Sequence, residues 1–214
     1  MLEVFITEKK YGKNIVLKDA AIHLSENGIY GFFGKNGQGK TTLFHCIMGF
    51  TEFQGKILFD GETLKSPDIA WLPTEPDMYE YLTGKEFIDF YAKNCGMKKL
   101  NPDNFLFEVN SANLIKEFST GMKKKTYINA ILQTTDYKIY VFDEPFNGLD
   151  IEANYRLLQH IRKLAETRIV LVSSHIIEIV LPYLKQCFFI DNTTAEICAP
   201  DTLTEKFFDD NHVD

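Results

Sequence analysis

A short glycine-rich segment, placed between two apolar stretches, constrains the fold of this chain more than any other feature. Residues 32–44 read FFGKNGQGKTTLF, in which three glycines and a lysine follow an apolar run. Glycine destabilises the interior of helices and strands alike, so this density requires a structural reason. A glycine-rich loop between a strand and a helix lets successive backbone N–H groups turn toward one anion. The segment therefore predicts a strand, a phosphate-binding loop and a helix, in that order.

The glycines and the lysine have the spacing GxxxxGK[ST], with Gly34, Gly39, Lys40 and Thr41 at its fixed positions and an additional Gly37. This spacing is typical of a loop that encloses the phosphates of a nucleotide. Lys40 is expected to reach the terminal phosphates, and the Thr41 hydroxyl is expected to bind magnesium. A glycine turn with a chance lysine is the alternative. The predicted nucleotide contacts in this loop are Gly34, Lys35, Asn36, Gly37, Gln38, Gly39, Lys40, Thr41 and Thr42.

Periodicity along the rest of the chain predicts an α/β fold. Strands are expected at residues 2–7, 15–24, 28–34, 56–60, 69–73, 138–145 and 168–174, and helices at 41–48, 83–94, 119–133, 151–166 and 176–183. In the second half, the strand–helix–strand–helix order implies parallel strands joined by crossover helices. Residues 101–114 are turn-prone and receive no assignment, whereas residues 209–214 are expected to form a solvated tail.

The composition excludes several classes of protein. With 214 residues, of which 45% are hydrophobic, the chain has the size of one domain and can bury a substantial core. The net charge of −7 argues against a broad nucleic-acid-binding surface, so no nucleic-acid partner is expected. Neither a signal peptide nor a membrane span is expected, because polar residues interrupt the most apolar run. The cysteines lack zinc-site spacing and are expected to be buried, reduced thiols of a cytosolic protein; they are Cys46, Cys95, Cys187 and Cys198.

Two acidic residues end the apolar run KIYVFDEP, and a histidine follows the next apolar run. Asp143, Glu144 and His175 should all lie at the carboxyl edge of a parallel sheet, where open α/β folds bind ligands. There Asp143 would position magnesium, and Glu144 would accept a proton from an attacking water. His175 would contact a terminal phosphate. Solvated acids at a strand end and a core or surface histidine are the simpler interpretations if the phosphate loop is ignored.

A second polar loop, within the sequence FSTGMKKK, precedes a predicted helix. Ser119 has the chemistry of an N-cap, and Gly121 would let the backbone approach an anion. Three lysines follow in the first helical turn, where positive charge opposes the helix dipole: Lys123, Lys124 and Lys125. A nearby anion would offset the repulsion between these lysines and the positive end of the helix dipole, and solvation of the side chains would weaken it. The sequence leaves both explanations open.

Together, these motifs resemble those of the ATP-binding-cassette (ABC) ATPases, the nucleotide-binding subunits of transporters. The resemblance covers nearly the whole chain, and the motifs follow in the family's order. It implies that the cofactors are ATP and Mg²⁺, and that Lys40, Glu144 and His175 are catalytic. It also implies that Tyr11 stacks on adenine and that Asp150, in NGLD, touches an opposite subunit. An exposed turn tyrosine and a helix N-cap are the respective alternatives.

The segment FSTGM resembles the family's signature LSGGQ, with Thr120 and Met122 in place of glycine and glutamine. The resemblance implies a head-to-tail dimer of identical or closely paralogous chains, in which Ser119, Thr120 and Gly121 contact ATP held by the second subunit. Variants of the STGMK kind resemble exporters of drugs, antibiotics, lipids or polysaccharides. The expected partner is therefore a separate transmembrane permease, which would hold the cytoplasmic chain at the inner face of the cell membrane.

The resemblance further implies a P-loop NTPase core, residues 1–74 and 135–214, with a mostly parallel sheet and an N-terminal antiparallel β part. A small α-helical subdomain would be inserted at about 75–134. One position departs from the family pattern, because relatives carry a magnesium-contacting glutamine where this chain has Thr74. Threonine is shorter by about two bonds, so its contact with magnesium requires an added water. Slow or weakly coupled hydrolysis is therefore expected.

Other functions remain open from the sequence. A regulatory ATP-binding module with little hydrolysis would be consistent with Thr74, although Lys40, Asp143 and Glu144 favour an enzyme. A soluble cassette ATPase acting on DNA or ribosomes is disfavoured by the acidic charge and by the absence of a second cassette. A small-molecule kinase or a GTPase would share the phosphate loop without the segment FSTGM. Among the aromatic residues of the subdomain, Tyr79 and Tyr81 are candidates for contact with a permease.

Overall fold

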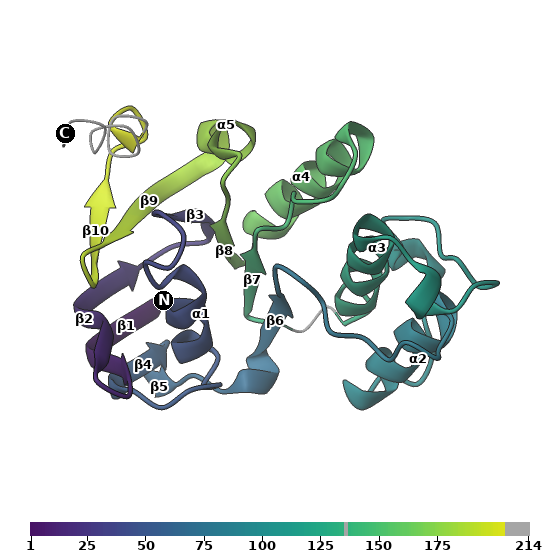
Figure 1. Ribbon diagram of the computed structural model, residues 1–214, viewed down its shortest axis with the longest axis horizontal. Coiled ribbons are helices and arrows are strands. Elements are labelled where there is room, and N and C mark those ends of the chain that lie inside the picture. Colours follow the sequence, from purple (N-terminus) through teal and green to yellow (C-terminus); the bar gives the residue numbers. More distant parts are fainter. Residues whose placement is uncertain (135–136, 204–214) are drawn as a thin grey trace.

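The computed structural model describes residues 1–134 and 137–203, so the tail expected at 209–214 lies outside the described residues. The described strands form two sheets (Figure 1). The first is antiparallel, with the strand order β2-β1-β4-β5. Its strands are β1 (Leu2–Tyr11), β2 (Asn14–Leu24), β4 (Gln54–Phe59) and β5 (Glu62–Thr63).

The second sheet has the order β10-β9-β3-β8-β7-β6, and only β10 runs antiparallel to its neighbour. Its strands are β3 (Gly28–Phe33), β6 (Ile69–Leu72), β7 (Ile139–Asp143), β8 (Ile169–Ser173), β9 (Leu184–Asp191) and β10 (Thr194–Cys198). The predicted α/β fold with a mostly parallel sheet and an N-terminal antiparallel part is thus confirmed. Strands β5, β9 and β10 had no counterpart in the sequence prediction.

Burial explains why the central strands read as continuous apolar runs. Every residue of β7 and β8 is buried, because helices and strands cover both faces of the parallel sheet. One face packs against α4 (Ile151–Ala165). The other packs against α1 (Lys40–Ile47) and the antiparallel sheet. These two cores fix the carboxyl ends of β3, β7 and β8 at one edge.

Two further helices, α2 (Gly84–Asn94) and α3 (Thr120–Ile131), lie to one side of both sheets (Figure 1). They pack on each other through a third apolar cluster. Helix α2 begins with a capping box between Thr83 and Glu86. Among the described residues, no helix combines the length and the apolar composition that a membrane crossing requires.

Two local predictions need correction, and one unassigned segment can now be described. The helix expected at 176–183 is only α5 (Ile177–Val180), followed by a 3₁₀ turn, Leu181–Tyr183, that contains Pro182; proline cannot continue the α-helical hydrogen bonding. The unassigned segment 101–114 contains a short 3₁₀ turn, Pro102–Asn104. Cys95 is exposed instead of buried because it follows the last turn of α2, whereas the other three cysteines are buried.

Candidate functional site

The phosphate loop, residues 34–42, joins β3 to α1 and needs glycine at both its base and its tip. Gly34 has a φ of +144°, and a Cβ added there would lie 2.3 Å from the carbonyl oxygen of Ile190 on β9. Gly37 has a φ of +82°, and no described atom lies within 4 Å of the position that its Cβ would take. The loop is therefore packed closely on β9 at one end and open at its tip.

Lys40, the first residue of α1, folds back over the phosphate loop. Its Nζ donates to the carbonyl oxygens of Gly34, at 2.7 Å, and Lys35, at 3.2 Å, and only 8% of the residue is exposed. Burial lowers the pKa of Lys40, while the nearby carboxylates of Glu144 and Asp143 act in the opposite direction. A phosphate would give this ammonium a stronger, charge-assisted partner than the two carbonyl groups.

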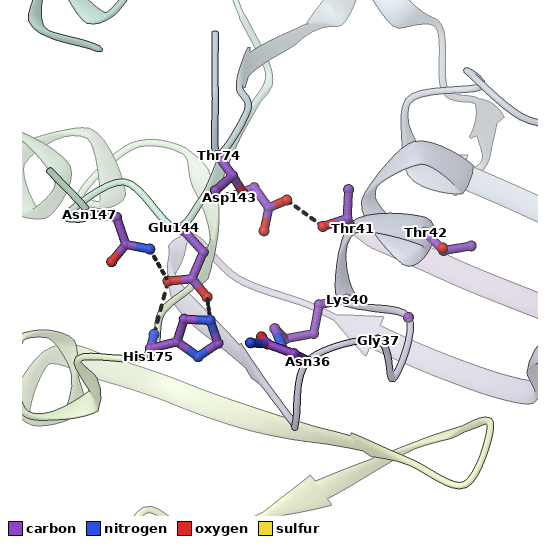
Figure 2. A pocket seen from close by; sticks show the side chains of 11 residues that line it. Asn36, Gly37, Lys40, Thr41, Thr42, Thr74, Asp143, Glu144, Asn147 and His175 are labelled. Carbon is purple, nitrogen blue, oxygen red and sulfur yellow. Dashed lines mark hydrogen bonds and ion pairs between the residues drawn. The ribbon is translucent and has the colours of Figure 1, made fainter. Parts of the chain in front are cut away.

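Strand β7 ends at Asp143, whose carboxylate lies beside Thr41 at the start of α1 (Figure 2). Thr41 Oγ1 donates to Asp143 Oδ2 at 2.6 Å. On the neighbouring strand, Ser173 is the register partner of Asp143, and its Oγ donates to Asp143 Oδ1 at 2.5 Å. Ser173 therefore fixes the plane of the carboxylate, and the sheet brings this carboxylate to the phosphate loop.

The paired oxygens of Thr41 and Asp143 suit magnesium, which prefers hydroxyl, carboxylate, phosphate and water oxygens. Within the described ranges, no three histidine, cysteine, aspartate or glutamate side chains gather into a metal site. Thr41 and Asp143 would supply one or two oxygen ligands to such an ion, and a bound nucleotide and water would supply the rest. Magnesium typically binds nucleotide enzymes in this way.

Glu144 is buried and has a left-handed backbone, with a φ of +50°, which is uncommon for a residue with a side chain. Its Oε2 accepts hydrogen bonds from the backbone N–H of His175, at 3.0 Å, and from Asn147 Nδ2, at 3.4 Å. Its Oε1 lies 3.1 Å from His175 Nε2, but without hydrogen-bond geometry, so this buried oxygen has no hydrogen-bond partner in the described part of the chain. The carboxylate is thus oriented, with one oxygen left to accept a proton.

These side chains surround a single cavity of about 360 Å³ at the carboxyl ends of β3, β7 and β8 (Figure 2). The cavity brings together the tip of the phosphate loop, both predicted acids, the predicted histidine and Thr74. Its lining residues are Asn36, Gly37, Gly39, Lys40, Thr41, Thr42, Thr74, Asp143, Glu144, Asn147 and His175.

Tyr11 lies outside this cavity. It is half exposed and lines a separate hollow of about 600 Å³, together with Phe50 and neighbouring residues. Lys9 Nζ lies 4.1 Å from the centre of the Tyr11 ring, so a cation–π contact covers one face of the ring. Tyr11 is thus an exposed aromatic ring with Lys9 packed on one face.

Ser119, Thr120, Gly121 and Asp150 do not line the cavity either. Ser119 Oγ accepts from the Met122 N–H at 3.2 Å and caps α3. Asp150 Oδ1 accepts from the backbone of the first turn of α4 at 2.8 Å, so this residue is an N-cap as well. Ser119 and Asp150 therefore both act as N-caps within this chain. Capping does not conflict with an additional contact to a second chain.

Two residues of the site were not predicted from the sequence. Ser173 contacts Asp143 and also accepts from the Glu144 N–H at 3.0 Å, and its signal was a hydroxyl in an otherwise apolar buried strand. Asn147 lines the cavity three residues after Glu144. Its role depends on the turn that the backbone makes at Glu144, which the sequence pattern does not encode.

Comparisons with known proteins agree with this geometry. Residues 17–147 match the family model described as ABC transporter. The ABC-type transporter ATP-binding protein EcsA of Bacillus subtilis is 31% identical over 211 residues, which cover 91% of this chain and 84% of that protein. The lantibiotic transport ATP-binding protein SrtF of Streptococcus pyogenes is 28% identical, with 83% and 81% covered.

A solved structure described as an ATP-binding subunit of an ABC transporter superposes with a TM-score of 0.82 at 27% identity and covers 97% of this chain and 93% of its own. The family model spans more than half of the chain and includes the phosphate loop, Asp143 and Glu144. The chain belongs to the ABC transporter family and has the fold of its ATP-binding subunits.

Proposed function

We propose that this chain binds and hydrolyses ATP as the nucleotide-binding subunit of a membrane transporter. One observation carries the proposal: a single cavity unites the open phosphate loop, Lys40, the Thr41–Asp143 oxygen pair and the oriented carboxylate of Glu144. A module that only bound ATP would not need a buried carboxylate that its neighbours orient into the cavity. The complete set therefore favours hydrolysis over the regulatory alternative.

Each residue has a defined task in this proposal. The backbone N–H groups of the phosphate loop and the Lys40 ammonium bind the phosphates. Thr41 and Asp143 would hold Mg²⁺, which would neutralise phosphate charge when bound. Glu144 accepts the proton of the attacking water at Oε1, and its contacts to His175 and Asn147 fix the direction of that oxygen. Attack on the terminal phosphorus then releases ADP and phosphate.

The proposed unit is a head-to-tail dimer of this chain or of this chain with a close paralogue. Support comes from the position of Ser119, Thr120 and Gly121, which lie at the N-terminus of α3 and outside the cavity. A helix N-terminus with a glycine backbone suits a phosphate, and a second chain can bring one to it. Asp150, at the start of α4, would contact the opposite chain.

A separate permease would dock on the region formed by residues 75–134, which we propose as the helical subdomain. Tyr79 and Tyr81 are 61% and 77% exposed, and Tyr79 packs edge-on against Phe90 with the ring centres 5.1 Å apart. Exposed aromatic groups of this kind favour an interface. The permease would keep the chain at the cytoplasmic face of the membrane, and the relative named for lantibiotic transport favours an exporter.

The test of this function measures phosphate release by the purified chain with MgATP, followed by the same measurement with its membrane partner in vesicles. We expect saturable hydrolysis and a stimulation by the partner that Tyr79→Ser/Tyr81→Ser removes without lowering the basal rate or the melting temperature. Absence of MgATP binding and hydrolysis would refute the ATPase assignment. Normal stimulation of the tyrosine variant would refute the docking surface alone.

Thr74 gives a prediction about the rate of hydrolysis. Thr74 lines the cavity, but its side chain is shorter than the glutamine that the family resemblance implies here, so it would need a bridging water to reach a bound ion. We expect Thr74→Gln to raise turnover several-fold, on the order of the gain from one well-placed polar group, about 1 kcal/mol. Steady-state phosphate release at saturating MgATP checks this, with Thr74→Asn as the control because asparagine remains one carbon shorter. An equal rate in Thr74→Gln and the parent would contradict the prediction.

A further inference from the structure

The three consecutive lysines after the signature segment, residues 118–122, have different environments. Lys123 is partly exposed and lies 3.8 Å from Glu80, and Lys125 forms a 2.6 Å ion pair with Asp150. Lys124, in contrast, is completely buried. Plain solvation, one of the two explanations that the sequence leaves open, therefore does not describe Lys124.

The ammonium group of Lys124 binds the loop that follows β7. Its Nζ donates to the carbonyl oxygen of Glu144 at 2.8 Å and to that of Asn147 at 3.0 Å. These carbonyl groups are the two ends of a four-residue turn, in which the Asn147 N–H also donates to the Glu144 carbonyl oxygen at 3.3 Å. Lys124 therefore closes the turn whose first residue is the proposed general base.

This contact matters because the turn begins with an unfavourable backbone conformation. Glu144 has a φ of +50°, which persists in proteins only where the surroundings enforce it. The same turn carries Asn147, whose side chain contacts Glu144 Oε2. A charged donor in a buried position binds carbonyl oxygens more strongly than a neutral donor. Burial lowers the pKa of Lys124 to about 8, and the charges of Glu144, Asp143 and Glu75 oppose that shift.

Two further contacts join the same segments. A Cβ added to Gly121 would lie 2.5 Å from the carbonyl oxygen of Gly148, so the signature segment and the loop after Asn147 touch through their backbones. One helical turn later, Lys125 pairs with Asp150 at the start of α4. The first residues of α3 thus contact the segment 144–150 along its length. Lys124 contacts its first residue, Glu144, and Lys125 contacts its last residue, Asp150.

We propose that Lys124 is a positioning residue that holds Glu144 in its hydrolytic orientation from the N-terminal turn of α3. The inference rests on the proposed ATPase function. It gives α3 two tasks: its cap faces outward, toward a second chain, while its buried lysine fixes the carboxylate of its own chain. Lys124 does not line the cavity, so it acts through the backbone of Glu144 and Asn147 without contacting nucleotide.

The test compares Lys124→Met, which keeps the length of the side chain but has no donor, with Lys124→Gln, which keeps a donor amide. Lys123→Met serves as the matched control, because it removes a partly exposed lysine one residue away. We expect Lys124→Met to lower kcat by roughly 100-fold, the size of effect that a misplaced catalytic group produces. KM and the calorimetric Kd for MgATP should stay within about twofold of the parental values, since Lys124 does not line the cavity that would bind the nucleotide.

A second readout needs no nucleotide. Amide hydrogen exchange across residues 144–150 should become at least about tenfold faster in Lys124→Met, because the turn loses its buried donor. For Lys124→Gln, both the exchange rate and kcat should lie between those of the parent and of Lys124→Met. Lys123→Met should match the parent in both measurements. These readouts separate positioning from a general loss of folding, which would raise exchange throughout the chain.

The outcomes are distinguishable. A parental kcat in Lys124→Met and in Lys124→Gln, while Glu144→Gln is inactive, would overturn the positioning role and leave the ATPase function intact. Equal losses of kcat and of MgATP affinity in Lys124→Gln would show a structural role and would also overturn the inference. Absence of MgATP binding by the parent would instead refute the proposed function.

Discussion

Replacing Glu144 by glutamine is expected to lower steady-state ATP hydrolysis by at least about 100-fold, the usual contribution of a general base. Glutamine has nearly the same shape, and its amide can keep a contact with Asn147, but it cannot accept a proton from water. The phosphate loop, Lys40 and Thr41 are unchanged, so MgATP should still bind. Because hydrolysis would open the proposed dimer, the variant should accumulate as an ATP-bound dimer.

The measurement combines phosphate release with light scattering after size-exclusion chromatography in MgATP. The variant should elute with twice the 24.7 kDa mass of one chain, and the parent should return to the single-chain mass as ATP is consumed. Glu75→Gln is the matched control, because Glu75 is an exposed acid one residue after Thr74 and outside the cavity. Hydrolysis by Glu144→Gln at the parental rate would remove Glu144 from the mechanism.

The chemistry of the site could be predicted where adjacent residues along the chain encode it. The phosphate loop needs a fixed order of glycines, lysine and threonine, and a buried strand followed by two acids indicates the ligand edge of a parallel sheet. Lys40, Asp143 and Glu144 were found in this way, and the structure brings them to one cavity. The apolar runs of β3, β7 and β8 were equally clear, because strands buried on both faces contain few polar residues.

The remainder depends on contacts between distant residues. Ser173 meets Asp143 through the register of β7 and β8, and a shift by one residue would turn its hydroxyl to the opposite face. Lys124 meets Glu144 through helix packing across 20 residues of sequence. Strands β9 and β10 were not assigned, because the apolar run at residues 187–190 lies beside a proline-containing turn and polar residues. No local pattern specifies these partners.

Replacing Lys40 by methionine should weaken MgATP binding by about 10- to 100-fold. The Lys40 ammonium is nearly buried and donates to the carbonyl oxygens of Gly34 and Lys35. It is therefore already aimed across the phosphate loop, and a phosphate gains a charge-assisted hydrogen bond of about 1.5–3 kcal/mol without the entropic cost of ordering an extended side chain. Methionine fills a similar volume but supplies neither the charge nor the donor.

Because residue 40 is buried, a positive charge there is not enough for MgATP binding unless the side chain also fits beneath the loop. Arginine at residue 40 would carry a charge but would have to fit a bulkier guanidinium beneath the loop, so Lys40→Arg should not restore affinity. Lys56→Met, which removes an exposed lysine from β4, should bind as the parent does. Fluorescence titration with a labelled adenine nucleotide in Mg²⁺ measures all three affinities. An unchanged Kd in Lys40→Met would mean that the backbone of the phosphate loop binds the nucleotide unaided, and that the lysine serves only to close the loop.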